Sequence, residues 1–275
     1  MRDEVRPQLS RLLEPLFEDV AAPAGSLPPV LAELYGGELA IDRPLLYANF
    51  VSSLDGIAAV DPEASGQGGL ISGGLAADRF LMGLLRALAD VVVIGAGTLR
   101  AEPRHRWTAA RVYPPAAEGF AELRRRLGLP PEPPLAVLSG SGRVDPNLPG
   151  LAGGSILTTP AGAARLGAAP AGVRVQVLGD GPLLPVPAAI GALRAAGNRA
   201  ILTEGGPHLF GELLAARLVD QLFLTVSPVL AGRVAGGGQV GLVEGAALLP
   251  GADRRGRLLS ARRSGSHLFL RYALG

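Results

Sequence analysis

Residues 199–228 read RAILTEGGPHLFGELLAARLVDQLFLTVSP, and the rest of the chain is organised around this stretch. Ala200 to Leu202 predict a short buried strand, Gly205-Gly206 a turn, and Pro207 the first residue of a helix, where its missing N–H is no loss. Apolar residues then recur at helical spacing, and residues 222–226 predict a second strand. The stretch is therefore a β-turn-α-β unit, whose helix directs free N–H groups out of one end of a sheet, where anions such as nucleotide phosphates bind.

Two carboxylates are predicted at the ends of strands. Glu204 follows the strand of this unit, and Asp55 follows a strand predicted over residues 45–53, because Asp55-Gly56 marks a turn. A tight βα turn with no ligand explains the glycine pair equally well. The carboxylate at the strand exit favours a functional site, since α/β proteins bind ligands there.

Composition limits the class of protein. The chain has 275 residues, 48% hydrophobic and 18% charged, which suits one large domain over residues 45–275 after an N-terminal extension over 1–44, with a helix at 8–20 and a linker. No apolar run is long enough to span a membrane, no secretory signal opens the chain and no cysteine is present, so we expect a cytoplasmic enzyme. All 26 basic residues are arginine, but the net charge is only +2 and aromatics are 4%, which argues against nucleic-acid binding.

The remaining pattern alternates strands and helices, which predicts an α/β fold with a mostly parallel sheet. Strands are predicted at 90–95, 135–138, 155–158 and 173–178, helices at 75–89 (started by Ser72), 161–166 and 186–196, and loops at 65–74 and 101–134. Residues 257–263 and 267–273 predict a C-terminal antiparallel hairpin. Because its apolar second strand, HLFLRYAL, is expected at an exposed sheet edge, we predict a homodimer.

A second glycine turn follows the buried strand at 90–95. Gly95 and Gly97 let a ligand approach the backbone closely, and Thr98 adds a hydroxyl for phosphate or ribose. Arg100 stands where a dinucleotide fingerprint has its third glycine, so an ordinary Rossmann domain is not predicted.

The surrounding sequence also predicts where several arginine, histidine and tryptophan side chains lie. From the long loop, Arg104, His105, Arg106 and Trp107 are the side chains expected to reach a pocket. The runs Arg124–Arg126 and Arg254-Arg255 are expected on solvated faces.

Several chemistries are excluded. The three histidines lie in different predicted elements, so no metal site is predicted, and the chain has neither a G-x-S-x-G elbow nor a Walker lysine. The remaining features are two strand-end carboxylates, two glycine turns and no strong nucleophile. They are typical of a reaction in which a cofactor carries out the difficult step.

Three motifs resemble the pyrimidine reductase domain of riboflavin biosynthesis. They are NFVSSLDG at 49–56, the LRA-to-Asp90 segment with VIGAGTLRAEP at 93–103, and LTEGGP at 202–207 with LVD at 218–220 and Ser227-Pro228. The resemblance covers about residues 45–273. It implies a dihydrofolate-reductase-like three-layer αβα sandwich with a mostly parallel mixed sheet and a C-terminal antiparallel hairpin, and a reductase that uses NADPH to convert the ribosyl group of 5-amino-6-(5-phosphoribosylamino)uracil to ribityl.

The resemblance also implies roles for particular residues. Asp55 and Glu204 are the expected catalytic residues. The expected substrate-binding residues are Asn49, Ser53, Arg86 and Arg104. The expected NADPH-binding residues are Val51, Gly95, Gly97, Thr98, Glu102, Ser139, Arg143, Gly205, Gly206, Pro207, His208 and Leu209, with Ser139 and Arg143 near the 2′-phosphate.

Some alternatives stay open at this point. Many members carry Lys or Arg after the SLDG motif, where this chain has Ile57, so the residue that holds a substrate phosphate is not fixed. No deaminase zinc motif precedes the domain, and a stand-alone reductase is expected. A dihydrofolate or other pterin reductase of the same fold is the first alternative, and a non-catalytic nucleotide-binding regulator the second. Arg86 as a helix-surface ion-pair partner and Glu204 as a satisfied strand-end carboxylate are the corresponding structural interpretations.

Overall fold

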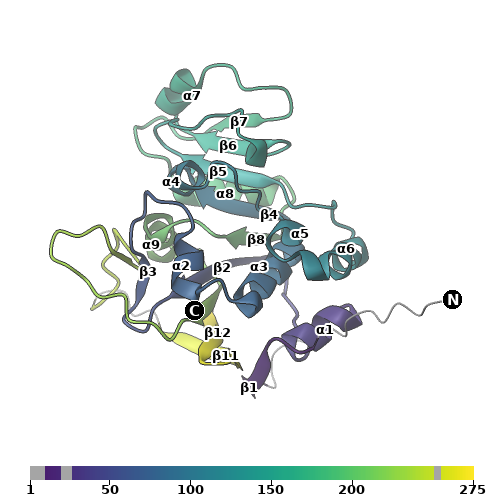
Figure 1. Cartoon of the computed structure of the whole chain (residues 1–275). Coiled ribbons are helices and arrows are strands. Elements are labelled where there is room, and N and C mark those ends of the chain that lie inside the picture. The colour runs from purple at the N-terminus through teal and green to yellow at the C-terminus, as the bar shows by residue number, and fades with distance from the viewer. Residues whose placement is uncertain (1–9, 20–26, 251–254) are drawn as a thin grey trace.

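The computed structural model describes residues 10–19, 27–250 and 255–275. Their main sheet has ten strands in the order β1-β11-β12-β9-β2-β8-β4-β5-β6-β7, and a small sheet pairs β10 with β3. Figure 1 shows β5, β6 and β7 at one end of the main sheet and the β11–β12 hairpin with β1 at the other. The strands are β1 Glu14–Glu18, β2 Leu45–Ser52, β3 Ile57–Ala59, β4 Val91–Gly95, β5 Leu135–Ser139, β6 Ser155–Thr158, β7 Arg174–Val177, β8 Ala200–Thr203, β9 Gln221–Val226, β10 Val240–Gly241, β11 Gly256–Ser264 and β12 His267–Leu274.

Helices cover both faces of the sheet. They are α1 Pro29–Tyr35, α2 Gln67–Ser72, α3 Ala76–Leu88, α4 Ala96–Ala101, α5 Ala109–Val112, α6 Ala117–Arg126, α7 Pro160–Leu166, α8 Val186–Ala195 and α9 Pro207–Ala215, with short 3₁₀ turns at Pro114–Ala116 and Pro149–Leu151. Val92 and Ile94 of β4 pack with α1, α3 and α6, whereas Val91 and Val93 pack with α8 and α9. Burial on both sides explains why β4 has no polar position.

The α/β class is confirmed, with three layers and a mixed sheet. Along the series β9-β2-β8-β4-β5-β6-β7, every neighbouring pair of strands is parallel. The three pairs β1–β11, β11–β12 and β12–β9 are antiparallel. The C-terminal hairpin is also confirmed, because β11 and β12 pair from Ser264↔His267 outward.

The N-terminal segment differs from its expected helix. Residues 14–18 form strand β1 on the sheet edge, paired with β11, and the rest of the 8–20 prediction lies partly outside the described residues. Pro15 is the physical reason, since proline breaks a helix interior but is tolerated in an edge strand. Leu13, Leu31 and Leu34 are fully buried in the main core, so the described residues before 45 pack with the rest of the chain.

Two predicted loops contain helices. The 65–74 loop forms α2, and Ser72 is its last residue; α3 begins after Leu75, so the cap predicted at Ser72 is wrong. The 101–134 loop contains α5 and α6. Their apolar residues are too few for a clear helical period, yet Phe120 and Leu123 reach the core.

The predicted solvated face of Arg124–Arg126 is wrong for one residue. Arg124 is 1% exposed, whereas Arg125 and Arg126 are exposed. Of the other run, Arg254 lies outside the described residues and Arg255 is exposed. A run of charged residues does not show which of them face solvent. Successive residues of a helix point in different directions, and in α6 Arg124 points inward.

The edge-strand argument for a homodimer is also wrong. Strand β12 lies between β11 and β9, and the edges of the main sheet are β1 and β7. The homodimer therefore loses that support and stays a prediction, which a molar mass from light scattering would test.

The contact between α3 and α6 predicts a stability change. A Cβ on Gly83 would lie 2.8 Å from Cζ of the buried Phe120 ring, whereas a Cβ on Gly191 of α8 would meet nothing within 4 Å. We expect Gly83→Ala to lower the free energy of unfolding by about 1–2 kcal/mol through overpacking. The matched Gly191→Ala should raise it by up to about 1 kcal/mol through helix propensity. Urea denaturation measures both, and equal stabilisation by the two variants would contradict the close packing.

Candidate active site

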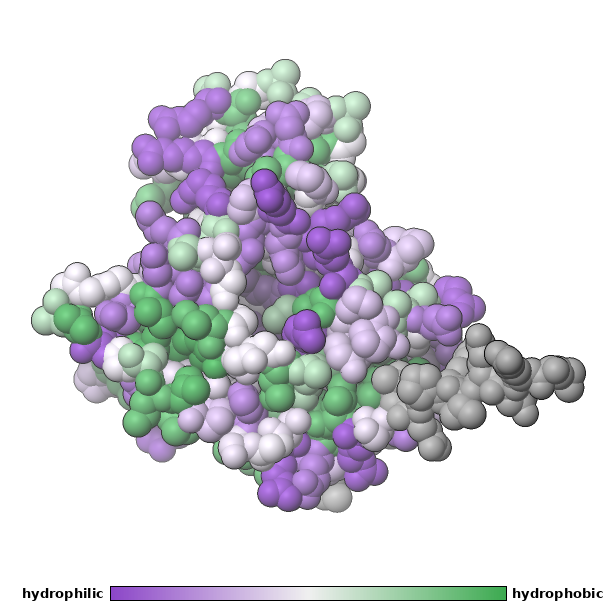
Figure 2. Space-filling view, in the orientation of Figure 1, coloured by the Kyte–Doolittle hydropathy of each residue, from purple (hydrophilic) through white to green (hydrophobic). Residues whose placement is uncertain are grey.

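The carboxyl ends of seven neighbouring parallel strands, β9 to β7, form one edge of the sheet. In open α/β sheets, ligands bind outside such an edge. Four segments leave strands there: 53–56 after β2, 95–98 after β4, 139–143 after β5 and 204–207 after β8. Figure 2 shows a hollow near the middle of this face, with mostly hydrophilic residues above it and mostly hydrophobic or neutral residues below and to the left, over the part of the molecule where Figure 1 shows β8 beside α9. The predicted site residues lie on these segments, on strand β2, on the helices beside them and on the loop after α4.

A buried ion pair joins α3 to the end of β8. Arg86 Nε lies 3.2 and 3.0 Å from Oε1 and Oε2 of Glu204, and Arg86 NH2 lies 2.7 Å from Oε2. The two side chains are 3% and 8% exposed. Asn49 Nδ2, on β2, lies 3.5 Å from Oε1 of the same carboxylate. Three residues that the sequence assigned to the substrate side are thus brought together, with Glu204 held along the edge of a guanidinium.

His105 completes this cluster from the loop after α4. Its Nε2 lies 3.2 Å from NH1 of Arg86, and its ring meets that of Trp107 edge-on at 4.8 Å. Because a guanidinium only donates, we assign Nε2 as the acceptor and place the ring proton on Nδ1. Burial, with the nearby charges of Arg86 and Arg111, lowers the pKa of His105 to about 4. The imidazole is therefore neutral at neutral pH.

The two glycine turns touch each other at the start of α9. The Gly206 N–H donates to Thr98 Oγ1 at 3.1 Å, and the Gly205 N–H to Thr203 Oγ1 at 3.3 Å. A Cβ on Gly205 would lie 2.6 Å from Cδ2 of Leu209, so a larger residue here would displace the Leu209 side chain. Helix α9 then begins at Pro207, and the N–H groups of its first turn, which includes His208 and Leu209, have no acceptor within the helix.

The turn after β4 is open on one side. A Cβ on Gly95 would meet nothing within 4 Å, and one on Gly97 would reach only NH2 of Arg100, at 4.0 Å. Glu102, at the end of α4, accepts a hydrogen bond from the Gly66 N–H at the start of α2. This contact ties α4 to the segment that enters α2.

The loop after β5 holds an unsatisfied hydroxyl. Ser139 is 4% exposed, and within the described residues its Oγ has no hydrogen-bond partner. Gly142 has φ +65°, and a Cβ there would lie 2.1 Å from the Gly162 carbonyl oxygen. Arg100 NH1 donates to the Arg143 carbonyl oxygen at 3.1 Å, which places two exposed arginines side by side at this loop.

Asp55 has a different environment from Glu204. Its carboxylate accepts from Ser53 Oγ at 2.6 Å and from the N–H groups of Ala231 and Gly232 at 3.0 and 2.8 Å. These hydrogen bonds lower the pKa of Asp55 to about 2, and the side chain is exposed. The Asp55 carboxylate thus links its own turn to the loop at residues 231–232. No hydrogen bond among the described residues joins it to Glu204.

Other predicted residues lie near the edge without joining the cluster. Val51 is half-buried on β2, where a Cβ on Gly68 would contact it, and Arg104 is exposed on the loop after α4. A cavity of about 30 Å³ is lined by Trp107, Glu132 and Pro149, and none of the residues of the ion-pair cluster lines it.

Sequence analysis missed Asp78, a buried carboxyl on α3. It lies eight positions before Arg86 and therefore on the same side of the helix. Burial raises its pKa. An acidic residue inside the apolar stripe of an amphipathic helix was the available signal.

The described residues contain no group of three or more His, Asp or Glu side chains suited to a metal ion. In the same part of the chain, no helix has both the length and the apolar character needed to cross a membrane.

The fold is that of an α/β protein in which glycine turns and a buried ion pair lie together at the carboxyl edge of the sheet. Residues 44–268 match the model of the RibD C-terminal domain, so the chain belongs to that family, a reductase family of riboflavin biosynthesis. None of the curated proteins compared with the chain matches it.

Solved structures share the fold. A pyrimidine reductase-like protein from Corynebacterium diphtheriae is 24% identical, with a TM-score of 0.60, over 91% of this chain and 96% of that one. RibD from Acinetobacter baumannii is 21% identical, with a TM-score of 0.63, over 90% of this chain but only 60% of its own length. The riboflavin biosynthesis reductase Rib7 of Saccharomyces cerevisiae is 13% identical, with a TM-score of 0.58, over 90% and 99% of the two chains. At these identities the likeness concerns the fold.

The low pKa of His105 predicts a pH dependence of stability. An unfolded histidine has a pKa near 6.5, against about 4 here, so between these values the unfolded chain binds more protons. The free energy of unfolding should fall as the pH drops from about 6.5 to about 4, by about 1–2 kcal/mol after allowance for partial exposure. His105→Gln keeps an acceptor for Arg86 but does not titrate, so the variant should lose less stability over this range. Parallel stability curves for both proteins in urea titrations would contradict the assignment.

Proposed function

We propose that this protein is an NADPH-dependent reductase that reduces the ribosyl group of 5-amino-6-(5-phosphoribosylamino)uracil to ribityl. The observation that carries the proposal is the meeting of the two glycine turns beside the Arg86–Glu204 pair, at the carboxyl edge of the sheet. Family membership supports the reductase class. The proposal includes action in the cytoplasm, which membership of a metabolic enzyme family supports.

The residues at the edge fit a dinucleotide. The first-turn N–H groups of α9 suit a pyrophosphate, and Thr98 lies next to them through Gly206. The unpartnered Oγ of Ser139 is a buried donor that lacks an acceptor, and Arg100 and Arg143 supply exposed guanidiniums at the same end. Val51, Gly95, Gly97 and Glu102 would line the path between these ends. When bound, NADPH supplies the hydride.

The polar cluster fits the substrate side. Glu204 presents a carboxylate whose orientation is fixed by Arg86, and Asn49 adds an amide beside it. Such preorganised groups orient a reacting molecule without rearranging. Because Arg86 is already paired, the exposed Arg104 is the better candidate to bind a substrate phosphate, while Asp55 and Ser53 would shape the turn beside β2 and keep a negative charge there.

Turnover tests the proposal. Purified protein is given NADPH with the phosphoribosylaminouracil, with its dephosphorylated form or with dihydrofolate, and NADPH absorbance is followed. Oxidation only with the phosphorylated pyrimidine, with ribityl product by mass spectrometry, is the expected result. Preference for dihydrofolate would favour a pterin reductase. NADPH binding without turnover on any of these would favour a regulator and overturn the proposal.

Glu204→Gln tests the substrate role. We expect kcat/KM to fall at least tenfold, corresponding to about 1.4 kcal/mol, with the affinity for NADPH nearly unchanged. Stability should also fall, because Arg86 would lose its buried counter-charge, and kinetics are therefore read below the melting temperature of the variant. A variant that keeps wild-type kcat/KM, or that simply fails to bind NADPH, would show a structural role instead.

Cofactor preference tests the arginines at the adenosine end. A guanidinium binds a 2′-phosphate bidentately, so NADPH should bind more tightly than NADH, and Arg143→Ala should reduce that preference roughly tenfold. Arg165→Ala, which removes an exposed arginine of α7, is the matched control. Calorimetry measures both affinities. Equal binding of the two cofactors would argue against the preference, and an unaltered ratio in Arg143→Ala would remove Arg143 from this role.

A further inference from the structure

The carboxyl end of α3 lacks the usual helix cap. The helix passes through Ala89, which is extended at φ −81° and ψ 141°, and enters β4 two residues later. No glycine in the left-handed conformation ends it, so its last carbonyl groups must find hydrogen-bond donors. The Ala89 N–H donates to the Arg86 carbonyl at 3.2 Å, and side chains from outside the helix supply further donors. These carbonyl groups are buried beside the core, where an unsatisfied carbonyl is unfavourable.

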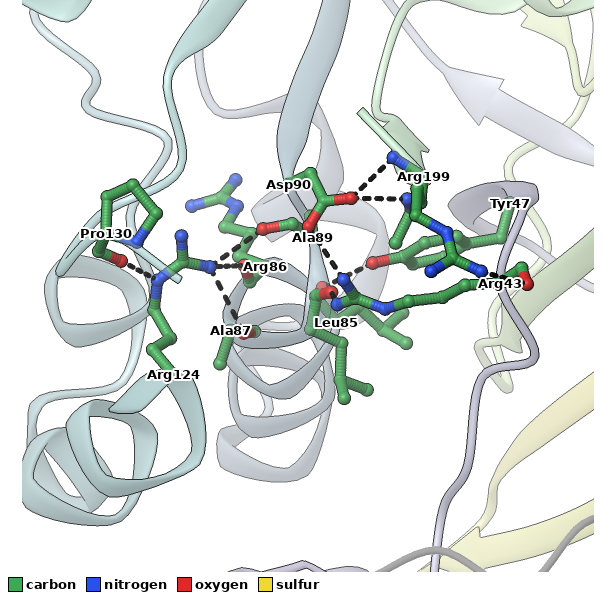
Figure 3. Close-up of polar contacts among 12 residues, drawn as sticks. Arg43, Tyr47, Leu85, Arg86, Ala87, Ala89, Asp90, Arg124, Pro130 and Arg199 are labelled. Atoms are coloured by element: carbon green, nitrogen blue, oxygen red, sulfur yellow. Dashed lines mark hydrogen bonds and ion pairs between the residues drawn. The ribbon is translucent and has the colours of Figure 1, made fainter. Parts of the chain in front are cut away.

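Three side chains from two other segments, residues 43–47 and α6, bind these carbonyl groups (Figure 3). Tyr47 Oη donates to the Leu85 carbonyl at 2.8 Å, and Arg43 NH2 donates to the Leu88 carbonyl at 2.8 Å. Arg124 NH1 donates to three more, at 3.2 Å to Arg86, 3.1 Å to Ala87 and 2.8 Å to Ala89. Cationic groups at a helix C-terminus also interact favourably with its dipole.

Arg124 is itself fixed. It extends from α6, is 1% exposed, and its Nε donates to the Pro130 carbonyl at 2.5 Å. Burial lowers the pKa of Arg124 to about 10, so the guanidinium stays charged at neutral pH. It contacts the cluster of Arg86, Glu204, Asn49 and His105 through the backbone carbonyl of Arg86.

The geometry connects Arg124 to the ion pair through one residue. The backbone of Arg86 is held by Arg124, and the side chain of Arg86 leaves the same turn to meet Glu204. On the other side, the Glu204 N–H donates to the Val93 carbonyl at 3.1 Å, which fixes it to β4. The strand thus fixes the carboxylate, and the last turn of α3 decides where the guanidinium lies.

We propose that Arg124 is a positioning residue. It holds the last turn of α3 so that Arg86 meets Glu204 in a two-point geometry, with Nε on Oε1 and NH2 on Oε2. Its effect on catalysis rests on the proposed reductase function, whereas its effect on the ion pair does not. The strength of that pair is sensitive to small displacements, because two parallel N–H···O contacts must align at once.

The test uses Arg124→Lys, with Arg124→Gln as a second variant, and Arg43→Met as the matched control. Lysine keeps the charge but has a single nitrogen. The guanidinium of Arg124 uses Nε for the Pro130 carbonyl and NH1 for three carbonyls at the end of α3. Arg43→Met removes a contact from the same helix end, but one that binds Leu88 and Asp90 rather than Arg86. Thermal unfolding is measured for each, so that variants are compared at similar stability.

The first readout is hydrogen exchange of the Arg86 Nε–H by nitrogen-15 NMR, assigned by its loss in Arg86→Lys. We expect exchange at least tenfold faster in Arg124→Lys and within twofold of wild type in Arg43→Met. The second readout is turnover, with kcat/KM for the pyrimidine falling about tenfold only in the Arg124 variants and NADPH affinity unchanged.

Equal exchange in the Arg124 and Arg43 variants, or activity that simply follows thermal stability in all of them, would overturn the positioning role. Failure of both Arg124 variants to fold would show a requirement for folding and would also overturn it. Should the wild type lack reductase turnover, the exchange readout still decides the role of Arg124, and the proposed function alone has failed.

Discussion

Arg86 and Glu204 are charges removed from water, and much of this edge of the molecule serves to keep them together. Dehydrating each ion costs several kcal/mol, which mutual attraction offsets only in good geometry with the remaining polar atoms satisfied. Here the geometry is two-point, Asn49 approaches one carboxylate oxygen, and His105 accepts from the free side of the guanidinium. The neutral imidazole matters, since a protonated His105 would place a second positive charge against Arg86 and lose its acceptor.

The elements that fix this pair come from distant parts of the chain. Glu204 directly follows strand β8, Arg86 lies on α3 and His105 lies on the loop after α4. A parallel sheet makes this possible, because the ends of β2, β4 and β8 reach the same edge although they are far apart in sequence. The same edge places the glycine turns next to the pair, so a nucleotide on the α9 side would lie beside a molecule bound on the α3 side.

The parts of the fold that the sequence predicted well are those determined by local physics. The boundaries of β6 and β8, the helix starting at Pro207 and the C-terminal hairpin follow from short apolar runs bounded by turn residues. Strand β1 was missed because its pairing with β11 spans most of the chain, and periodicity carries no information about such partners. The position of β12 inside the sheet was missed for the same reason, since an edge exists only relative to the other strands.

Buried polar residues were the harder part of the site. Family motifs pointed to Arg86 and Glu204, but nothing in the order of residues showed that they pair with each other. The sequence predicted Arg124 in solvent because charge runs usually are solvated, whereas its burial depends on three carbonyl groups at the end of the neighbouring helix α3. Asp78 differs, because an acidic residue within the apolar stripe of α3 can be recognised in the sequence, although its burial against the opposing element cannot.

Asp55 and Glu204 show that the same sequence signal, a carboxylate between a strand and a glycine, can occur in two different environments. Both follow a parallel strand and precede glycine, yet Asp55 is exposed and held by two backbone N–H groups, while Glu204 is buried against a cation. An exposed carboxylate stabilised by N–H groups stays ionised and keeps its loop in place. A buried one that already neutralises Arg86 leaves that guanidinium little net charge to offer. A phosphorylated substrate at this edge would therefore need its cation from elsewhere, and the exposed arginines of the surrounding loops, rather than the buried pair, are the part of the site that would distinguish a phosphorylated ligand from an unphosphorylated one.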